Sequence, residues 1–182
     1  RLRFALDAGP GSTSTTTTQA AEKVYRSTGA VSEISVTATV GDEAFLEWMP
    51  QETILFDGAR MRRENLVDVA GTGRILTGEI VVFGRRARGE VFADGYLHDS
   101  WRIRRDSKLV WGDALHLDGA PGERIGRRYT FASAAAVGTL IYTASDADRH
   151  LETARECLES GPATVRGAAT VVLVLHRRGD AV

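Results

Sequence analysis

The chain has 182 residues, and 23 Lys and Arg against 24 Asp and Glu give a net charge of −1. This length suits one domain, and the balanced charge argues against nucleic acid or a membrane as a partner. The single cysteine, Cys157, excludes an intrachain disulfide and a zinc site built from thiolates, and it fits a reducing cytoplasm. No run reaches the roughly 18 apolar residues of a membrane span.

Much of the chain alternates apolar and polar residues with the period of half-buried strands. Alternation or strand propensity favours strands over residues 1–8, 12–18, 31–40, 43–48, 53–56, 61–69, 75–83, 90–93 and 101–104. The pair Gly41-Asp42 predicts a hairpin turn between its two flanking strands. Residues 19–26 have a helical composition instead. Short strands at near-regular intervals predict an all-β sandwich, a barrel or a helical stack of strands.

The period changes near the C-terminal end. After a loop at residues 119–122, an apolar run predicts a strand over residues 135–142. A good N-cap residue, an apolar helical stripe and a Gly161-Pro162 stop then predict one α-helix over residues 146–160. A last apolar run predicts a strand over residues 170–175. The predicted fold class is therefore mainly β, with one helix.

Three carboxylates stand beside glycines within or at the end of apolar strands, namely Asp57, Glu79 and Glu90. A buried carboxylate must find a partner or line a wet cavity. Salt bridges to the arginines of residues 85–88 are one interpretation. A polar passage is a second, because weak, spaced carboxylate ligands let a divalent cation move on. A glycosidase acid/base pair is a third, which nothing else in the chain supports.

Other site signals are weak. The four histidines, His98, His116, His150 and His176, lack the spacing of three or four residues that metal ligands have on a helix. His150 and Cys157 lie on about one side of the predicted helix, but two ligands are too few for a resident metal. The glycine-rich stretches lack the lysine of a phosphate-binding loop, and no G-x-S-x-G motif occurs. The sequence predicts no catalytic residues.

Three motifs follow one another along the chain. They are TTQAAEKVYRS at residues 17–27, MPQETILFDGA at residues 49–59, and Glu79 followed by Gly84-Arg85 and Gly89-Glu90. In this order they resemble the urease accessory proteins of the UreD (UreH) family, over most of the chain. The resemblance implies a single domain over residues 1–182, folded as a β-helix-like stack of short strands.

The resemblance also implies a cytoplasmic, non-enzymatic scaffold and metallochaperone for nickel insertion into apo-urease. The implied partners are apo-urease and the accessory proteins UreF and UreG. Nickel(II) would pass transiently through an internal tunnel, with no tightly bound cofactor. Asp57, Glu79 and Glu90 match motif positions and are the predicted residues of this path. A β-rich hydrolase that uses these carboxylates and a purely structural interaction module are the alternatives.

The chain departs from the family pattern at both ends. The family has a Gly-rich segment ending in Gly-Gly-Asp before the strand that matches residues 2–6, and it continues beyond the strand that matches residues 170–175. The chain instead starts at Arg1, with neither an initiator Met nor a signal peptide. We therefore expect a fragment that lacks both ends. The family's Leu-Pro-Gln is Met49-Pro50-Gln51 here, a near-neutral apolar exchange.

Overall fold

The chain winds into a β-solenoid of about three turns, as the computed structural model shows for residues 1–161 and 167. Its strands are β1 (Leu2–Ala8), β2 (Thr13–Thr16), β3 (Glu22–Val24), β4 (Ser32–Val40), β5 (Phe45–Trp48), β6 (Thr53–Leu55), β7 (Arg60–Val69), β8 (Arg74–Phe83), β9 (Gly95–Arg105), β10 (Lys108–Gly119) and β11 (Ala136–Thr143). Its helical segments are η1 (Arg86–Arg88), α1 (Pro121–Gly126), η2 (Ala147–His150) and α2 (Leu151–Ser160). The predicted mainly β stack of strands is confirmed.

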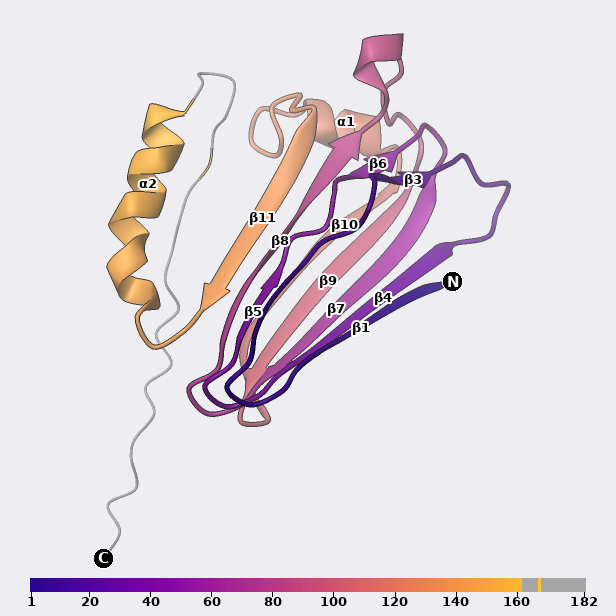
Figure 1. Cartoon of the computed structure of the whole chain (residues 1–182). Helices are drawn as coiled ribbons and strands as arrows, with labels where there is room; N and C mark the ends of the chain where they lie inside the picture. Colours follow the sequence, from indigo (N-terminus) through magenta and orange to yellow (C-terminus); the bar gives the residue numbers. More distant parts are fainter. Residues whose placement is uncertain (162–166, 168–182) are drawn as a thin grey trace, which may run out of the picture.

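Two sheets form the walls of the solenoid (Figure 1). Sheet A has the order β1-β4-β7-β9-β10, and sheet B has the order β2-β5-β8-β6-β3 with β11 paired to β8. Each turn places one strand in sheet A and then one long or two short strands in sheet B. The pairs between turns are parallel, whereas β10 and β11 are antiparallel to their neighbours. The stack therefore changes strand direction after its third turn.

Alternation decides which side chains face the interior. Along β7, every second residue from Met61 to Val69 is buried, while Arg62 and Glu64 between them are exposed. Successive side chains of a strand point to opposite faces of the sheet, so this pattern fixes one inner and one outer face. Parallel pairing in register then stacks each inner position on the same position of the next turn.

Sheet B splits beside Pro50. On one side of the split β5 pairs with β8 as far as Thr77, and on the other side β6 resumes this pairing at Val81. Proline has no N–H to give to a sheet, so the chain around Pro50 leaves the ladder. Glu79 lies on β8 at the level of this split, and its paired residue is Thr139 on β11.

The interior has a polar layer between two apolar clusters. One cluster gathers around Leu55, Met61 and Phe83, and the other gathers around Val40 and Ile75. Between them β7, β8 and β9 carry the inward-facing polar residues, which are Arg63, Asn65, Thr77, Glu79 and Asp99. The solenoid therefore encloses a band of charge at the level where sheet B splits.

Two predictions about the first half of the chain are wrong. Residues 19–26 contain strand β3 in place of a helix, because parallel pairing of β3 with β6 outweighs the local helical propensity. Gly41-Asp42 is not a hairpin turn, because β4 and β5 belong to different sheets. This pair forms instead a corner of the solenoid, where Gly41 N–H donates to the carbonyl of Ala8 at 2.8 Å.

Further corrections concern the second half. Residues 90–93 do not form a strand. Residues 108–119, for which no strand is predicted, form β10, and the loop at residues 119–122 gives way to α1. The predicted helix over residues 146–160 is confirmed as η2 followed by α2. The predicted strand over residues 170–175 lies outside the described residues.

The hairpin between β9 and β10 lacks the usual sequence signal. Its two turn residues, Asp106 and Ser107, have φ angles of 47° and 65°. Such turns normally carry Asn-Gly or Asp-Gly, because glycine reaches positive φ without strain.

Among residues 1–161, no helix is long and apolar enough to cross a membrane.

Gly84 and Gly89 offer a matched test of this backbone. Both have positive φ, 79° and 72°, but a Cβ on Gly84 would lie 2.5 Å from the carbonyl oxygen of Glu90, whereas a Cβ on Gly89 would meet nothing within 4 Å. We expect Gly84→Ala to lower the free energy of unfolding by about 3 kcal/mol and Gly89→Ala by about 1 kcal/mol. Urea denaturation of both variants checks this. Equal losses would show that the contact with Glu90 contributes nothing.

Candidate functional site

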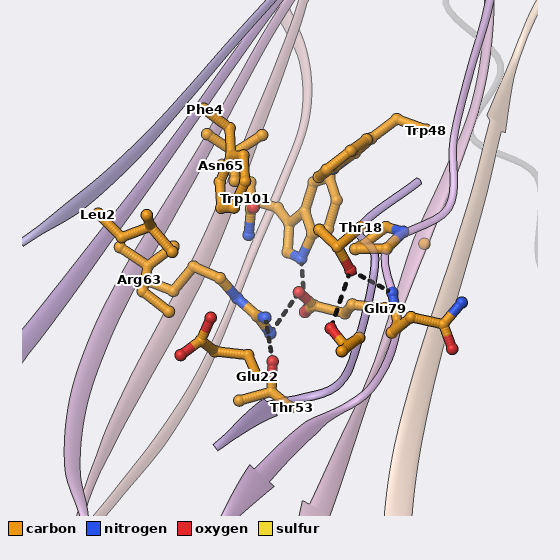
Figure 2. A pocket seen from close by; sticks show the side chains of 16 residues that line it. Leu2, Phe4, Thr18, Glu22, Trp48, Thr53, Arg63, Asn65, Glu79 and Trp101 are labelled. Atoms are coloured by element: carbon orange, nitrogen blue, oxygen red, sulfur yellow. Dashed lines mark hydrogen bonds and ion pairs between the residues drawn. The ribbon is translucent and has the colours of Figure 1, made fainter. Parts of the chain in front are cut away.

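Arg63 is a buried arginine that binds two carboxylates. Its guanidinium forms ion pairs with Glu79 and Asp99, and the side chains of Arg63, Glu79 and Asp99 are 6%, 9% and 2% exposed. Arg63 Nε donates to Asp99 Oδ1 at 3.1 Å, and Nη1 donates to Thr53 Oγ1 at 3.0 Å. Figure 2 shows Arg63 reaching toward both Glu79 and Thr53. The hydrogen bonds that its N–H groups donate offset the cost of burying this charge.

The two carboxylates reach Arg63 from opposite walls. Asp99 on β9 is the paired neighbour of Arg63 on β7, both in sheet A, while Glu79 comes from β8 in sheet B. Trp101 Nε1 donates to Glu79 Oε1 at 2.9 Å, and Asn65 Nδ2 donates to Asp99 Oδ1 at 3.2 Å. We call Arg63, Asn65, Glu79, Asp99 and Trp101 the Arg63 cluster.

The Arg63 cluster holds more negative than positive charge. With both acids ionised, one guanidinium faces two carboxylates, which leaves a net charge of −1. Burial raises the pKa of Glu79 from its ordinary 4.5 to about 7, and the negative charge of Asp99 adds to this, while Arg63 acts in the opposite direction. Near neutral pH the cluster therefore holds a proton for part of the time.

Two cavities meet at this cluster. The first, of about 40 Å³, lies at the split in sheet B and is lined by Thr18, Pro50 and Gln51 among others. The second, of about 200 Å³, lies toward β10 and β11 and is lined by polar and apolar side chains, including Asp113. Glu79 and Trp101 line both cavities. These two side chains therefore form part of the wall that separates the cavities.

The structure divides the three predicted site residues between two places. Glu79 belongs to the Arg63 cluster and lines both cavities. Asp57 and Glu90 lie together elsewhere, where Asp57 N–H donates to Glu90 Oε1 at 3.1 Å. Neither residue lines either of these cavities. The side chains of Asp57 and Glu90 are 25% and 23% exposed, so water reaches them more readily than it reaches Glu79.

Asp57 is held by backbone amides and an arginine. Its Oδ1 accepts hydrogen bonds of 3.0 Å from the N–H groups of Ala93 and Asp94, and its carboxylate pairs with Arg26. The bond from Asp94 holds the pKa of Asp57 below its ordinary value, and the bond from Ala93 and the charge of Arg26 add to this. Asp57 therefore ties the loop after η1 to the turn after β6.

Glu90 is held in the same way. Its carboxylate pairs with Arg85, whose Nε donates to Glu90 Oε2 at 3.2 Å. This hydrogen bond lowers the pKa of Glu90, and the bond from the Asp57 amide adds to the effect. The Arg85 guanidinium also stacks 4.1 Å above the Phe56 ring. The predicted pairing of a carboxylate with the arginines of residues 85–88 is therefore confirmed for Glu90.

Sequence reasoning missed the partners of Glu79. Arg63, Asp99 and Trp101 occupy the buried phase of strands β7 and β9, where apolar residues are the rule. The sequence did carry one sign of the cluster, because Arg63 and Asp99 are charged residues at positions that the alternation predicts to be buried. The sequence does not show which residues pair, because Arg63 and Asp99 are 36 residues apart and Trp101 and Glu79 are 22 residues apart.

The described part of the chain has no ready-made metal centre. Within residues 1–161, no group of three or more His, Cys, Asp or Glu side chains is placed to hold a metal ion. Glu79 and Asp99 supply carboxylates to the cluster, but Arg63 occupies them both.

Comparison with known proteins gives consistent matches. A family model described as UreD urease accessory protein matches residues 1–178. The urease accessory protein UreD of Xanthobacter autotrophicus is 44% identical over 84% of this chain and 53% of its own length. UreD 1 of Methylobacterium radiotolerans is 42% identical over 98% of this chain and 64% of its own length. UreD of Magnetococcus marinus is 43% identical over 94% of this chain and 61% of its own length. The chain thus spans between half and two thirds of these relatives.

Two buried threonines test how the Arg63 cluster is held. Thr53 Oγ1 accepts a hydrogen bond from Arg63, whereas Thr77 Oγ1 has no hydrogen-bond partner in the described structure. We expect Thr53→Val to lower the free energy of unfolding by about 1–3 kcal/mol, because a guanidinium N–H loses its acceptor. Thr77→Val should be neutral or stabilising, because it removes an unpaired hydroxyl at constant shape. Thermal and urea denaturation of both variants measure this, and a larger loss for Thr77→Val would contradict it.

The raised pKa of Glu79 predicts a pH-dependent stability. Between pH 4.5 and about 7, Glu79 binds a proton more readily in the folded state than in the unfolded state. Protonation of Glu79 therefore stabilises the fold fully below pH 4.5, and this contribution is lost as the pH rises through 7. In Glu79→Gln this dependence should disappear, which amounts to on the order of 3 kcal/mol between pH 4.5 and 8. Urea denaturation across this range checks it, with Glu64→Gln on the exposed face as control. Parallel curves for wild type and Glu79→Gln would contradict it.

Proposed function

Since this chain belongs to the UreD urease accessory protein family, we propose that it serves urease maturation as a scaffold and metallochaperone that catalyses no reaction itself. Nickel(II) is the proposed cargo, apo-urease the proposed recipient, and UreF and UreG the proposed further partners. The proposed site of action is the cytoplasm. The names of the relatives support a role in urease maturation, and the Arg63 cluster supports a role in handling a cation.

The observation that carries the proposal is the position of Glu79. Its carboxylate lies in the wall between two cavities, in a cluster whose net charge is −1 with both acids ionised. An excess negative charge in a buried site favours a cation over an anion or a neutral molecule. Because Arg63 competes for the same carboxylates, a cation is bound weakly and released readily. These properties suit a point of transit.

Asp57 and Glu90 are a separate part of the proposal. We retain them as candidate path residues, since they lie together near the protein surface and are partly exposed. A structural role is the competing hypothesis, because Arg26, Arg85 and three backbone amides already occupy their oxygens. Variants of all three carboxylates distinguish the two roles.

The burial of Glu79 and Asp99 favours the passage of a cation over the hydrolysis of a sugar. A glycosidase places two carboxyl groups at an open cleft, with room for a sugar between them. Glu79 and Asp99 are 9% and 2% exposed, and one arginine binds both. A sugar therefore cannot reach these two carboxylates, and neither of them is free to act separately as a general acid or a general base. This geometry supports the passage against the hydrolase alternative.

The test uses the full-length protein that carries this chain, co-expressed with urease and its other accessory proteins. We expect Glu79→Gln to lower urease activity and the nickel content of purified urease at least severalfold, because the uncharged amide attracts a cation less. Co-purification of the accessory complex should not change, since the substitution is buried. Glu64→Gln, on the exposed face of β7, is the matched control and should activate urease normally.

Two results would contradict a role of these carboxylates in metal transit. If Glu79→Gln folds, co-purifies with its partners and still gives urease its full nickel content, Glu79 is not on the path. If Glu79→Gln, Asp57→Asn or Glu90→Gln instead loses the partners at normal stability, the carboxylate concerned supports docking. Far-UV circular dichroism and thermal denaturation of each variant separate these results from misfolding.

A further inference from the structure

The outer face of sheet A carries two histidines side by side. His98 on β9 and His116 on β10 are directly paired in the antiparallel register. Their chain neighbours Leu97, Asp99 and Leu117 are buried, so the two histidines point outward. His116 is exposed and His98 is half-buried. Spacing along the sequence gave no sign of this pair, because a hairpin brings it together.

The geometry of the two rings fits a shared metal ion. Their centroids are 5.6 Å apart and their planes are inclined by 65°. With metal–nitrogen bonds of about 2.1 Å, one ion bound by two imidazoles holds the ring centroids about 5–6 Å apart. Imidazole nitrogen is a preferred ligand of zinc, copper and nickel. The rings are therefore already close to the separation that chelation requires.

The surroundings of the pair limit its movement and its affinity. The Tyr96 ring packs edge-on against His116 with centroids 5.7 Å apart, which restrains the imidazole. Arg62, the paired neighbour of His98 on β7, donates from Nη2 to the Tyr96 hydroxyl at 3.0 Å. Its positive charge opposes a metal ion nearby. This predicts weaker binding than the two imidazoles alone would give.

From this placement we propose that His98 and His116 form a surface site that binds a divalent transition-metal ion reversibly, with water completing the coordination, because two protein ligands are too few to keep a resident metal. The site lies on the opposite side of sheet A from the Arg63 cluster, since β9 presents His98 outward and Asp99 inward. It is therefore separate from the interior path proposed above, and it does not depend on that path. The ligand class is a first-row ion that prefers nitrogen, such as Zn²⁺ or Cu²⁺.

Calorimetry with Zn²⁺ alone, on the full-length protein, tests the site. We expect His98→Ala and His116→Ala each to weaken one binding event by about tenfold or more, because one imidazole cannot chelate. Arg62→Gln should strengthen the same event, because it removes the opposing charge. His150→Ala is the matched control, as His150 is an exposed histidine that pairs with Asp146, and it should leave this event unchanged.

Electron paramagnetic resonance with Cu²⁺ gives a second readout that does not depend on affinity. The wild-type protein should show two coordinated nitrogens, and each single variant should show one. The proposal is overturned if both histidine variants bind Zn²⁺ as wild type does, or if the wild-type Cu²⁺ signal lacks the second nitrogen. Because both side chains point outward, circular dichroism should confirm that the variants fold.

Discussion

The structure depends on one arginine that joins both walls of the solenoid. Arg63 on sheet A binds Asp99 beside it and Glu79 across the interior on sheet B. Removal of one partner from a buried ion pair costs about 3–5 kcal/mol, because the other charge is left without compensation. The positions that precede Arg63 in its ladder are Leu2 and Ile34, so the first two turns are apolar at this level. In this ladder the charged side chain is Arg63, in the third turn.

The polar layer and the cavities have a common origin. Apolar clusters fill the solenoid on either side, and Pro50 interrupts sheet B at the level of Glu79. A cavity lies where the polar layer meets the split, and Pro50, Arg63 and Glu79 line it. Glu79 lines both cavities at this level, between the two apolar clusters. The proposed function thus follows from where the apolar packing is interrupted.

Local pattern was sufficient to predict most strands and the burial of the Glu79 carboxylate, but not the pairing of the strands. Alternation identified β7 and β8, and an acid beside Gly78 in an apolar strand marked Glu79. Pairing between turns is set by register over long separations, so Arg63 and Asp99 could not be matched from the sequence. The hairpin that joins His98 to His116 was missed because Asp106 and Ser107 take a turn that normally requires glycine.

The one local pairing in the solenoid bears on how the chain folds. In the described part of the chain, β9 and β10 are the only consecutive strands that are also hydrogen-bonded neighbours. Every other ladder requires a long loop to close before its contacts form, and this loop-closure entropy slows folding. We expect the β9–β10 hairpin to nucleate first and to serve as the template on which β7, β4 and β1 assemble in reverse chain order. Among the described strands of sheet A, the two that are synthesised last would then be the first to acquire structure.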